Sequence, residues 1–259
     1  MIQLACILLL VTLPWSESAS DPNVVCPVGK ELTIKEAPWL ASIRSNNRHI
    51  CIGSIINPKS VLITASCLVQ RNRTAVWSHH MSNVTVRVGN ADRDSGAGVA
   101  VCDIIYHPRE KNFHLDSALA MLKLCKPLTP SAEVQEIAIV DKQPPKDAKA
   151  SLSGWGSLTR WGMRHTHCKV IARQQDVQLI DVKACAVERT KHFKYARLER
   201  TICSSKISNF CSFDNGSPLL IDGKLAGILN IGSCNLKPDV YVNLFSVRNW
   251  IESKAKDKK

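Results

Sequence analysis

The residues with the clearest potential for chemistry lie in one short segment, Cys211-Ser-Phe-Asp-Asn-Gly-Ser-Pro218. It holds a carboxylate at Asp214, an amide at Asn215 and a hydroxyl at Ser217. A serine hydroxyl becomes a nucleophile when a general base, most often histidine, lies within hydrogen-bond reach. An amide cannot be activated in this way, because a neighbouring imidazole cannot deprotonate it. Asn215 therefore cannot form an acyl-enzyme, and no motif places a histidine beside Ser217 or Ser66.

The histidines provide no second chemical centre. His165 and His167 precede Cys168 and could form one corner of a metal site. No second cluster of ligands accompanies them, so a loop histidine pair beside a bridged cysteine is the better interpretation. We expect no metal ion and no cofactor.

The first residues have the composition of a secretory leader. Residues 1–20 contain an apolar run, Leu4 to Leu13, followed by the small residues Ser18-Ala-Ser20, which is typical of a cleaved signal peptide. The run is too short to cross a bilayer, and no other apolar stretch approaches that length, so we predict no transmembrane segment. Removing Cys6 with the leader leaves ten of the 11 cysteines, an even number that predicts a disulfide framework. We therefore expect secretion, to the extracellular space or a secretory vesicle.

The charge of the chain narrows the classes of partner. The formal net charge is +12. A basic secreted protein has either a solvated basic surface or a binding site for acidic glycans or anionic membranes. Aromatic residues are not interleaved with the basic ones, which argues against a nucleic-acid-binding face.

Short β-branched and apolar runs, bounded by Asn, Pro and Lys, follow one another along the chain and predict antiparallel strands. These runs cover residues 38–43, 51–56, 61–64, 84–88 and 97–105. We expect residues 21–36 to be irregular and residues 70–83 to form a polar loop. The sequons at Asn72 and Asn83 lie in or next to that loop, where a glycan is sterically tolerated, so both are predicted glycosylation sites.

Several segments resemble, in the same order, the motifs of trypsin-like serine proteases. Residues 211–218 are similar to the active-site loop C-x-G-D-S-G-G-P, and residues 51–67 to C-G-G-S-L-I…W-V-L-T-A-A-H-C. Ser151-Leu-Ser-Gly-Trp-Gly156 resembles the family's S-G-W-G, and residues 247–256 its C-terminal helix. The resemblance covers about residues 37–253. It implies an all-β fold of two six-stranded antiparallel Greek-key barrels with a C-terminal helix.

The domain organisation follows from this resemblance. A signal peptide, residues 1–20, and an N-terminal segment, residues 21–36, precede a homology domain that spans residues 37–259. Within that domain the first barrel is expected at about 37–140, the second at about 141–245 and the helix at about 246–256.

The same resemblance implies a degenerate catalytic triad. The nucleophile position is Asn215, the histidine position is Ser66 and the aspartate position is Ala118. Asp116 lies two residues early, and a small gap in the alignment could restore it. Serine has no group that titrates near neutral pH, so Ser66 cannot act as the general base.

The activation segment and the substrate cleft also depart from the family pattern. The place of the activating cleavage reads Val24-Val-Cys-Pro-Val-Gly29, with no basic residue ahead of it, so Asp214 has no evident ammonium partner. In the cleft, we expect Phe213 at the mouth, Ile231 on the wall and Asp239 in place of a glycine. These three substitutions predict a closed or partly filled cleft, in which Asp239 either finds a basic neighbour or pushes its loop outward.

The resemblance also implies disulfide pairs. Three pairs match family bridges: Cys51 with Cys67, Cys185 with Cys203, and Cys211 with Cys234. Cys102 and Cys125 fall on segments expected to be neighbouring strands, which favours a cross-strand bridge. Elimination leaves Cys26 with Cys168, although sequence alone does not give bridge geometry.

The resemblance is to an inactive member of the family, and the first-barrel motifs are most similar to those of testis-type members. It predicts a secreted, non-catalytic homologue, not an enzyme, that binds or scaffolds an extracellular or cell-surface protein. Two alternatives stay open. One is a basic adhesion factor for an acidic glycan or membrane surface, and the other is an active peptidase with an unorthodox site.

Overall fold

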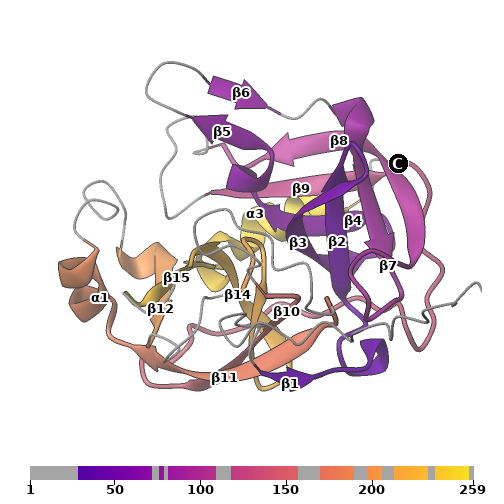
Figure 1. Cartoon of the computed structure of the whole chain (residues 1–259). Helices are drawn as coiled ribbons and strands as arrows, with labels where there is room; N and C mark the ends of the chain where they lie inside the picture. Colours follow the sequence, from indigo (N-terminus) through magenta and orange to yellow (C-terminus); the bar gives the residue numbers. More distant parts are fainter. Residues whose placement is uncertain are drawn as a thin grey trace, which may run out of the picture.

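The computed structural model describes residues 29–71, 76–78, 81–108, 118–156, 170–189, 198–205, 213–232 and 237–256. Figure 1 shows two groups of strands, one from each half of the chain, with short helical segments at their edges. In this described part of the chain, no helix is long and apolar enough to cross a membrane.

The first half of the chain forms a closed antiparallel barrel with the strand order β2-β3-β4-β9-β8-β7. Alternate residues of its strands, such as Val84, Val86 and Val88, point into a core of aliphatic side chains, as expected for strands with one solvated face. Asn46 and Asn47 have positive φ angles and make the tight turn between the first two strands. The six strands are β2 (Leu40–Ser45), β3 (Arg48–Asn57), β4 (Ser60–Thr64), β7 (Val84–Val88), β8 (Ala97–Tyr106) and β9 (Leu119–Leu124).

The second half forms another ring of six antiparallel strands. Pairing of Leu179 with Ser204 and of Ile180 with Cys203 closes the sheet between β11 and β12. Phe213 and Tyr241 lie in the core of this barrel. The strands are β10 (Lys149–Gly154), β11 (Arg173–Ile180), β12 (Thr201–Ser204), β13 (Pro218–Ile221), β14 (Lys224–Ile231) and β15 (Asp239–Asn243).

Each end of the described chain is tied to the barrel built by the opposite half. Near the start, β1 (Lys30–Glu31) pairs with β11 of the second barrel. At the other end, α3 (Arg248–Ala255) packs Ile251 into a core shared by both barrels. The carbonyl of Ala255 accepts hydrogen bonds from Asn57 Nδ2 of the first barrel, at 2.8 Å, and from Lys123 Nζ, at 3.1 Å. Helix α3 therefore contacts both barrels and links them.

Two closed six-stranded antiparallel barrels with a short C-terminal helix confirm the predicted fold. Several small elements were not predicted. β1 lies in the segment expected to be irregular, and β5 (Val69–Arg71) and β6 (Val76–Ser78) form a ribbon within the expected loop. Helix α1 (Val182–Glu188) begins after Asp181, whose carboxylate accepts a hydrogen bond from the Lys183 amide. The remaining segments are the short helical turns η1 (Ile34–Glu36), η2 (Ala65–Cys67), η3 (Met81–Asn83), η6 (Leu198–Arg200) and η7 (Phe245–Val247).

Disulfides join three of the predicted cysteine pairs. Cys51 and Cys67 link β3 to η2, Cys102 and Cys125 link β8 to β9, and Cys185 and Cys203 link α1 to β12. The other four cysteines of the predicted framework, Cys26, Cys168, Cys211 and Cys234, lie outside the described residues.

Candidate functional site

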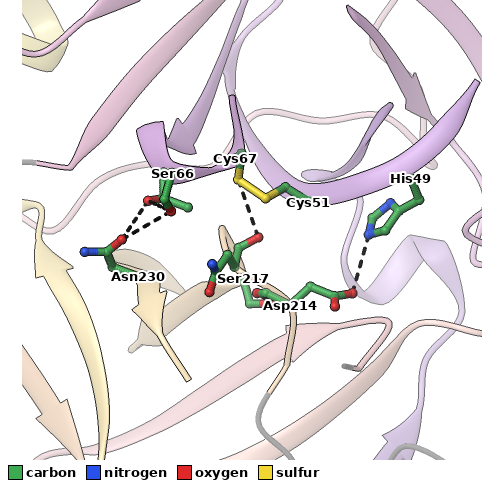
Figure 2. Close-up of a disulfide and its surroundings, with 9 residues drawn as sticks. His49, Cys51, Ser66, Cys67, Asp214, Ser217 and Asn230 are labelled. Carbon is green, nitrogen blue, oxygen red and sulfur yellow. Dashed lines mark hydrogen bonds and ion pairs between the residues drawn. A yellow bond between two sulfur atoms is a disulfide. The ribbon is translucent and has the colours of Figure 1, made fainter. Parts of the chain in front are cut away.

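The structure brings the three residues that the alignment assigns to the triad, Ser66, Ala118 and Asn215, close together where the two barrels meet. Ser66 lies on η2, and the amide of the preceding Ala65 donates to the carbonyl of Ala118, at 2.9 Å. The carbonyl of Asn215 accepts a hydrogen bond from the amide of Ile52, at 3.0 Å. Cys67 Sγ is 3.9 Å from the same carbonyl (Figure 2). The motifs therefore converge in space as the alignment implies. Asp116, the alternative acid, lies outside the described residues.

A neutral hydrogen-bond network occupies this meeting point. Thr64 Oγ1 donates to Asn230 Oδ1, at 2.9 Å, and is 3.0 Å from Ser66 Oγ. Ser66 Oγ is 3.5 Å from the same amide oxygen (Figure 2). Thr64 belongs to β4 and Asn230 to β14, so the network joins the two barrels. Two hydroxyls and an amide cannot accept a proton at neutral pH, so this network can orient and hold but cannot provide a general base.

Asp214 has a partner that the sequence analysis did not find. His49 Nε2 lies 3.4 Å from Asp214 Oδ2, and His49 Nδ1 is hydrogen-bonded to Ser42 Oγ, at 2.8 Å. Trp155 packs edge-on against the imidazole, with ring centroids 5.8 Å apart. His49 and Asp214 are buried enough to restrict solvent, with side-chain exposures of 6% and 19%. The carboxylate of the loop thus lies beside a histidine of β3, within ion-pair distance but without a hydrogen bond between Nε2 and Oδ2 (Figure 2).

This arrangement places a serine, a histidine and an aspartate in one chain of contacts, so its chemical capacity must be considered. Ser42 is only 1% exposed. A substrate carbonyl must come within about 3 Å of a nucleophile, which a buried hydroxyl inside β2 does not allow. Ser42, His49 and Asp214 therefore offer no route for acyl transfer through the Ser42 hydroxyl.

The loop that carries Asn215 keeps its shape through backbone packing. Gly216 has φ +90, and a Cβ atom there would lie 1.8 Å from the carbonyl oxygen of Ile52. The amide of Gly216 donates to the carbonyl of Leu229, at 2.8 Å. Ser217 Oγ donates to the carbonyl of Asp214, at 2.7 Å, and its residue is fully buried. The Ser217 hydroxyl is therefore used within its own loop.

The three residues expected to fill the substrate cleft have different environments. Phe213 is 5% exposed and packs in the second-barrel core with Leu152 and Tyr241. The expectation that it lies at the mouth of the cleft was wrong, because the ring turns inward to the apolar core. Ile231 packs beside the disulfide of Cys185 and Cys203.

Asp239 is 2% exposed and has a cationic neighbour in Arg189, which is also buried. Burial lowers the pKa of Arg189, and the nearby charges of Asp239 and Glu188 partly oppose this effect. Arg189 Nε donates to the carbonyl of Pro238, next to Asp239. Of the two predicted outcomes for Asp239, the structure has the basic neighbour and not the outward loop. Burial, reinforced by the Asp239 charge, raises the pKa of Tyr241 well above its ordinary range.

The two sequons differ in what the structure shows. Asn83 is exposed at the end of η3, and its side chain is accessible to a glycosyltransferase. Asn72 lies outside the described residues.

Comparison with known sequences finds similarity to trypsin and to related proteins along most of the chain. The trypsin family profile matches residues 27–251. Hypodermin-B of Hypoderma lineatum is 29% identical, over 88% of this chain and 86% of that protein, and trypsin of Sarcophaga bullata is 28% identical, over 88% of each. Vaa serine proteinase homolog 1 of Vipera ammodytes ammodytes is 25% identical, over 95% of this chain and 92% of that protein.

The fold comparison agrees with the sequence comparisons. The solved structure of neuropsin, a serine protease expressed in the limbic system of mouse brain, superposes with a TM-score of 0.71 at 22% identity. The match covers 88% of this chain and 99% of neuropsin. Because the family profile spans both barrels, the chain belongs to the trypsin family of serine proteases.

Proposed function

We propose that this chain is a secreted, non-catalytic member of the trypsin family that acts by binding a protein partner outside the cell. One observation carries the proposal. Where the family places its histidine, Ser66 donates into a hydroxyl and amide network with Thr64 and Asn230. None of these three side chains is able to take a proton from a nucleophile at neutral pH.

The nucleophile position supports the same conclusion. Asn215 has an amide in place of a hydroxyl, and the neighbouring Ser217 is buried with its hydroxyl donated to the loop backbone. Loss of both nucleophile and base removes the covalent pathway and leaves only binding. The similarity of the first-barrel motifs to testis-type inactive members adds support, as does the existence of relatives named as protease homologs.

Several relatives are named as trypsins and others as protease homologs, so membership of the family does not decide between activity and inactivity. The alternative of an unorthodox peptidase has one specific feature behind it, the contacts of Ser42, His49 and Asp214. Burial of Ser42 opposes it.

The test is covalent labelling of the purified, secreted full-length protein by a fluorophosphonate probe. No labelling is expected under conditions that label trypsin completely. The variants Ser42→Ala, Ser66→Ala and Ser217→Ala serve as controls. Labelling of the wild type that disappears in one of these variants would show an active serine and overturn the proposal.

Binding is tested separately, by affinity capture from the tissue that expresses the protein most strongly. Chemical cross-linking before capture should recover the same extracellular protein in repeated preparations. The reduced, unfolded protein is the matched control. Capture of an identical set of proteins by the unfolded control would contradict a specific scaffolding role.

A further inference from the structure

Five lysines lie on segments that the fold brings together around the end of helix α3. They come from the β3–β4 turn, from the end of β9 and from the helix itself. We call this surface the lysine face, and it consists of Lys59, Lys123, Lys126, Lys254 and Lys256.

The backbone of three distant segments is hydrogen-bonded together beneath the lysine face. Lys123 Nζ donates to the carbonyl of Ala255, at 3.1 Å, and to Ser60 Oγ, at 2.9 Å. The amide of Leu124 donates to the carbonyl of Lys59, at 3.0 Å. α3 therefore lies against β9 and the β3–β4 turn (Figure 1). The lysines are held near one another by the fold and not by closeness in sequence.

The charges of this surface are mainly of one sign. Lys126, Lys254 and Lys256 are exposed, and Lys59 and Lys123 are half-buried. Among the described residues of these segments and the adjacent strand, the acid that faces the lysines is Asp103, paired in register with Lys123. Glu252, on the preceding turn of the helix, is occupied by Arg248. Glu136 is a further acid nearby, since it lines a hollow together with Pro58, the residue before Lys59. Lysines still outnumber these acids among the described residues, and the excess produces a local potential that attracts anions.

The chemistry of this surface fits a flexible polyanion better than a protein interface. Cores of protein interfaces are rich in aromatic side chains and depleted in lysine. The exposed large apolar side chains of the described residues are Met81, Val187 and Phe245, and none belongs to the lysine face. Phe245 precedes α3 and so lies at the other end of that helix.

Anionic lipids are the other source of dense negative charge. They line mainly the cytoplasmic leaflet of membranes. The three disulfides are typical of proteins that fold in an oxidising compartment, on the other side of the membrane. Sulfated polysaccharides meet such proteins directly.

We propose that the lysine face binds a sulfated polysaccharide chain of the cell surface or extracellular matrix, by multiple lysine–sulfate contacts. This inference is independent of whether the old catalytic site is active, since none of the five lysines contacts it. Binding of this kind is driven by release of counterions from the polyanion and is therefore strongly weakened by salt.

The experiment uses the full-length secreted protein and heparin as the probe. Salt elution from immobilised heparin and affinity at physiological ionic strength are measured for the wild type and for the triple variant Lys126→Gln, Lys254→Gln, Lys256→Gln. These side chains are exposed, so the thermal unfolding midpoint should not change. We expect the affinity of the triple variant to fall by about 10- to 100-fold, with a shallower salt dependence.

The matched control is Lys142→Gln, Lys149→Gln, Lys183→Gln, which removes the same charge from exposed positions of the second-barrel half. It should retain nearly all of the affinity. Equal losses in the two variants would show diffuse attraction and overturn the proposal, as would failure of the wild type to bind heparin. Undiminished binding to desulfated heparin, or binding to phosphatidylserine vesicles or polyglutamate that exceeds binding to heparin, would assign the surface to another partner.

Discussion

The hydroxyl of Thr64 in the first barrel is joined to the amide oxygen of Asn230 in the second by a hydrogen bond of 2.9 Å. Ser66 shares the same acceptor. The space between the barrels is therefore organised around the side chain of Asn230, and this arrangement has consequences for any attempt to restore catalysis.

Restoring the triad with Ser66→His, Ala118→Asp and Asn215→Ser should give no measurable peptidase activity. The side chain of Asn230 remains at the position of the new histidine, and Asp214 remains in contact with His49 instead of with a new amino terminus. Hydrolysis of a panel of fluorogenic peptides is the measurement. The control for background hydrolysis carries Ser66→His and Ala118→Asp together with Asn215→Ala in place of Asn215→Ser. Turnover clearly above that background would mean that the loop is already in a working shape.

Gly216→Ala should destabilise the protein strongly, because the new methyl group would collide with the carbonyl oxygen of Ile52. We expect a loss of more than about 3 kcal/mol in the free energy of unfolding, from steric overlap added to backbone strain. Gly223→Ala is the matched control, since Gly223 also has a positive φ but no atom within 4 Å of an added Cβ. Strain alone should cost it about 1 kcal/mol. Denaturant unfolding of both variants measures the difference, and equal losses would contradict the steric argument.

Asp94→Asn should lower stability at pH 7 by about 1 kcal/mol, a figure limited by the exposure of this carboxylate. Burial alone would raise the pKa of Asp94, but hydrogen bonds from Arg44 and Arg93 outweigh it and hold the pKa below the ordinary 3.8. The folded state therefore binds the proton less readily than the unfolded state. The stabilisation that ionised Asp94 provides is complete above the pKa that Asp94 has in the unfolded state. It is lost as the pH falls through the lower pKa that Asp94 has in the folded state.

Urea unfolding between pH 7 and pH 2 measures this effect. The difference between wild type and Asp94→Asn should shrink towards the acid end of the range. Asp141→Asn, which breaks an exposed pair with Lys224, serves as the comparison and should have the smaller effect. If the difference in unfolding free energy between wild type and Asp94→Asn stayed constant throughout this pH range, it would contradict a stabilising role for ionised Asp94.

Asn83 should carry a glycan when the full chain is secreted from eukaryotic cells, because the residue is exposed at the end of η3. Peptide N-glycosidase treatment should reduce the mass of the wild type by more than that of Asn83→Gln. Asn215 also begins a formal sequon, Asn215-Gly-Ser217, but its loop is packed and Pro218 follows. Asn215→Gln should therefore leave the glycan mass unchanged, and a shift in that variant would contradict the packing of the loop.

Non-reducing peptide mapping should find Cys211 joined to Cys234 and Cys26 joined to Cys168, in addition to the three disulfides described above. Each native bridge in a small secreted domain contributes about 2–5 kcal/mol to stability. A free thiol at Cys211 would undo the alignment on which the triad positions depend.

Local strand patterns predicted the all-β class, whereas the two-barrel architecture was predicted from the resemblance to trypsin-like proteases. Runs such as residues 51–56 and 84–88 carry their own β-branched pattern, and each became a strand. β1 has no such pattern, since both of its residues are exposed and its pairing with β11 is created by the tertiary fold. The predicted positions Ser66, Ala118 and Asn215 likewise came from local motifs.

The partners within the site could not be predicted in the same way. His49 meets Asp214, and Thr64 meets Asn230, only because the two barrels are packed against each other. No spacing rule links residues so far apart in the chain. Phe213 was misplaced for a similar reason, because an alignment assigns a position in the loop and not the direction of the side chain.

Each terminal segment of the described chain is bound to the barrel of the opposite half, and this has a consequence for proteolysis. The stretch before β2 is paired with the second barrel, and the last helix is hydrogen-bonded to the first. A single cut in the connector between β9 and β10 therefore releases neither half, because two other segments still cross from one to the other. Such a nicked protein should run as two fragments under reducing, denaturing conditions and migrate as one particle under native ones. During synthesis, likewise, the first barrel leaves apolar residues such as Leu62 and Met121 without their full cover until α3 has been made.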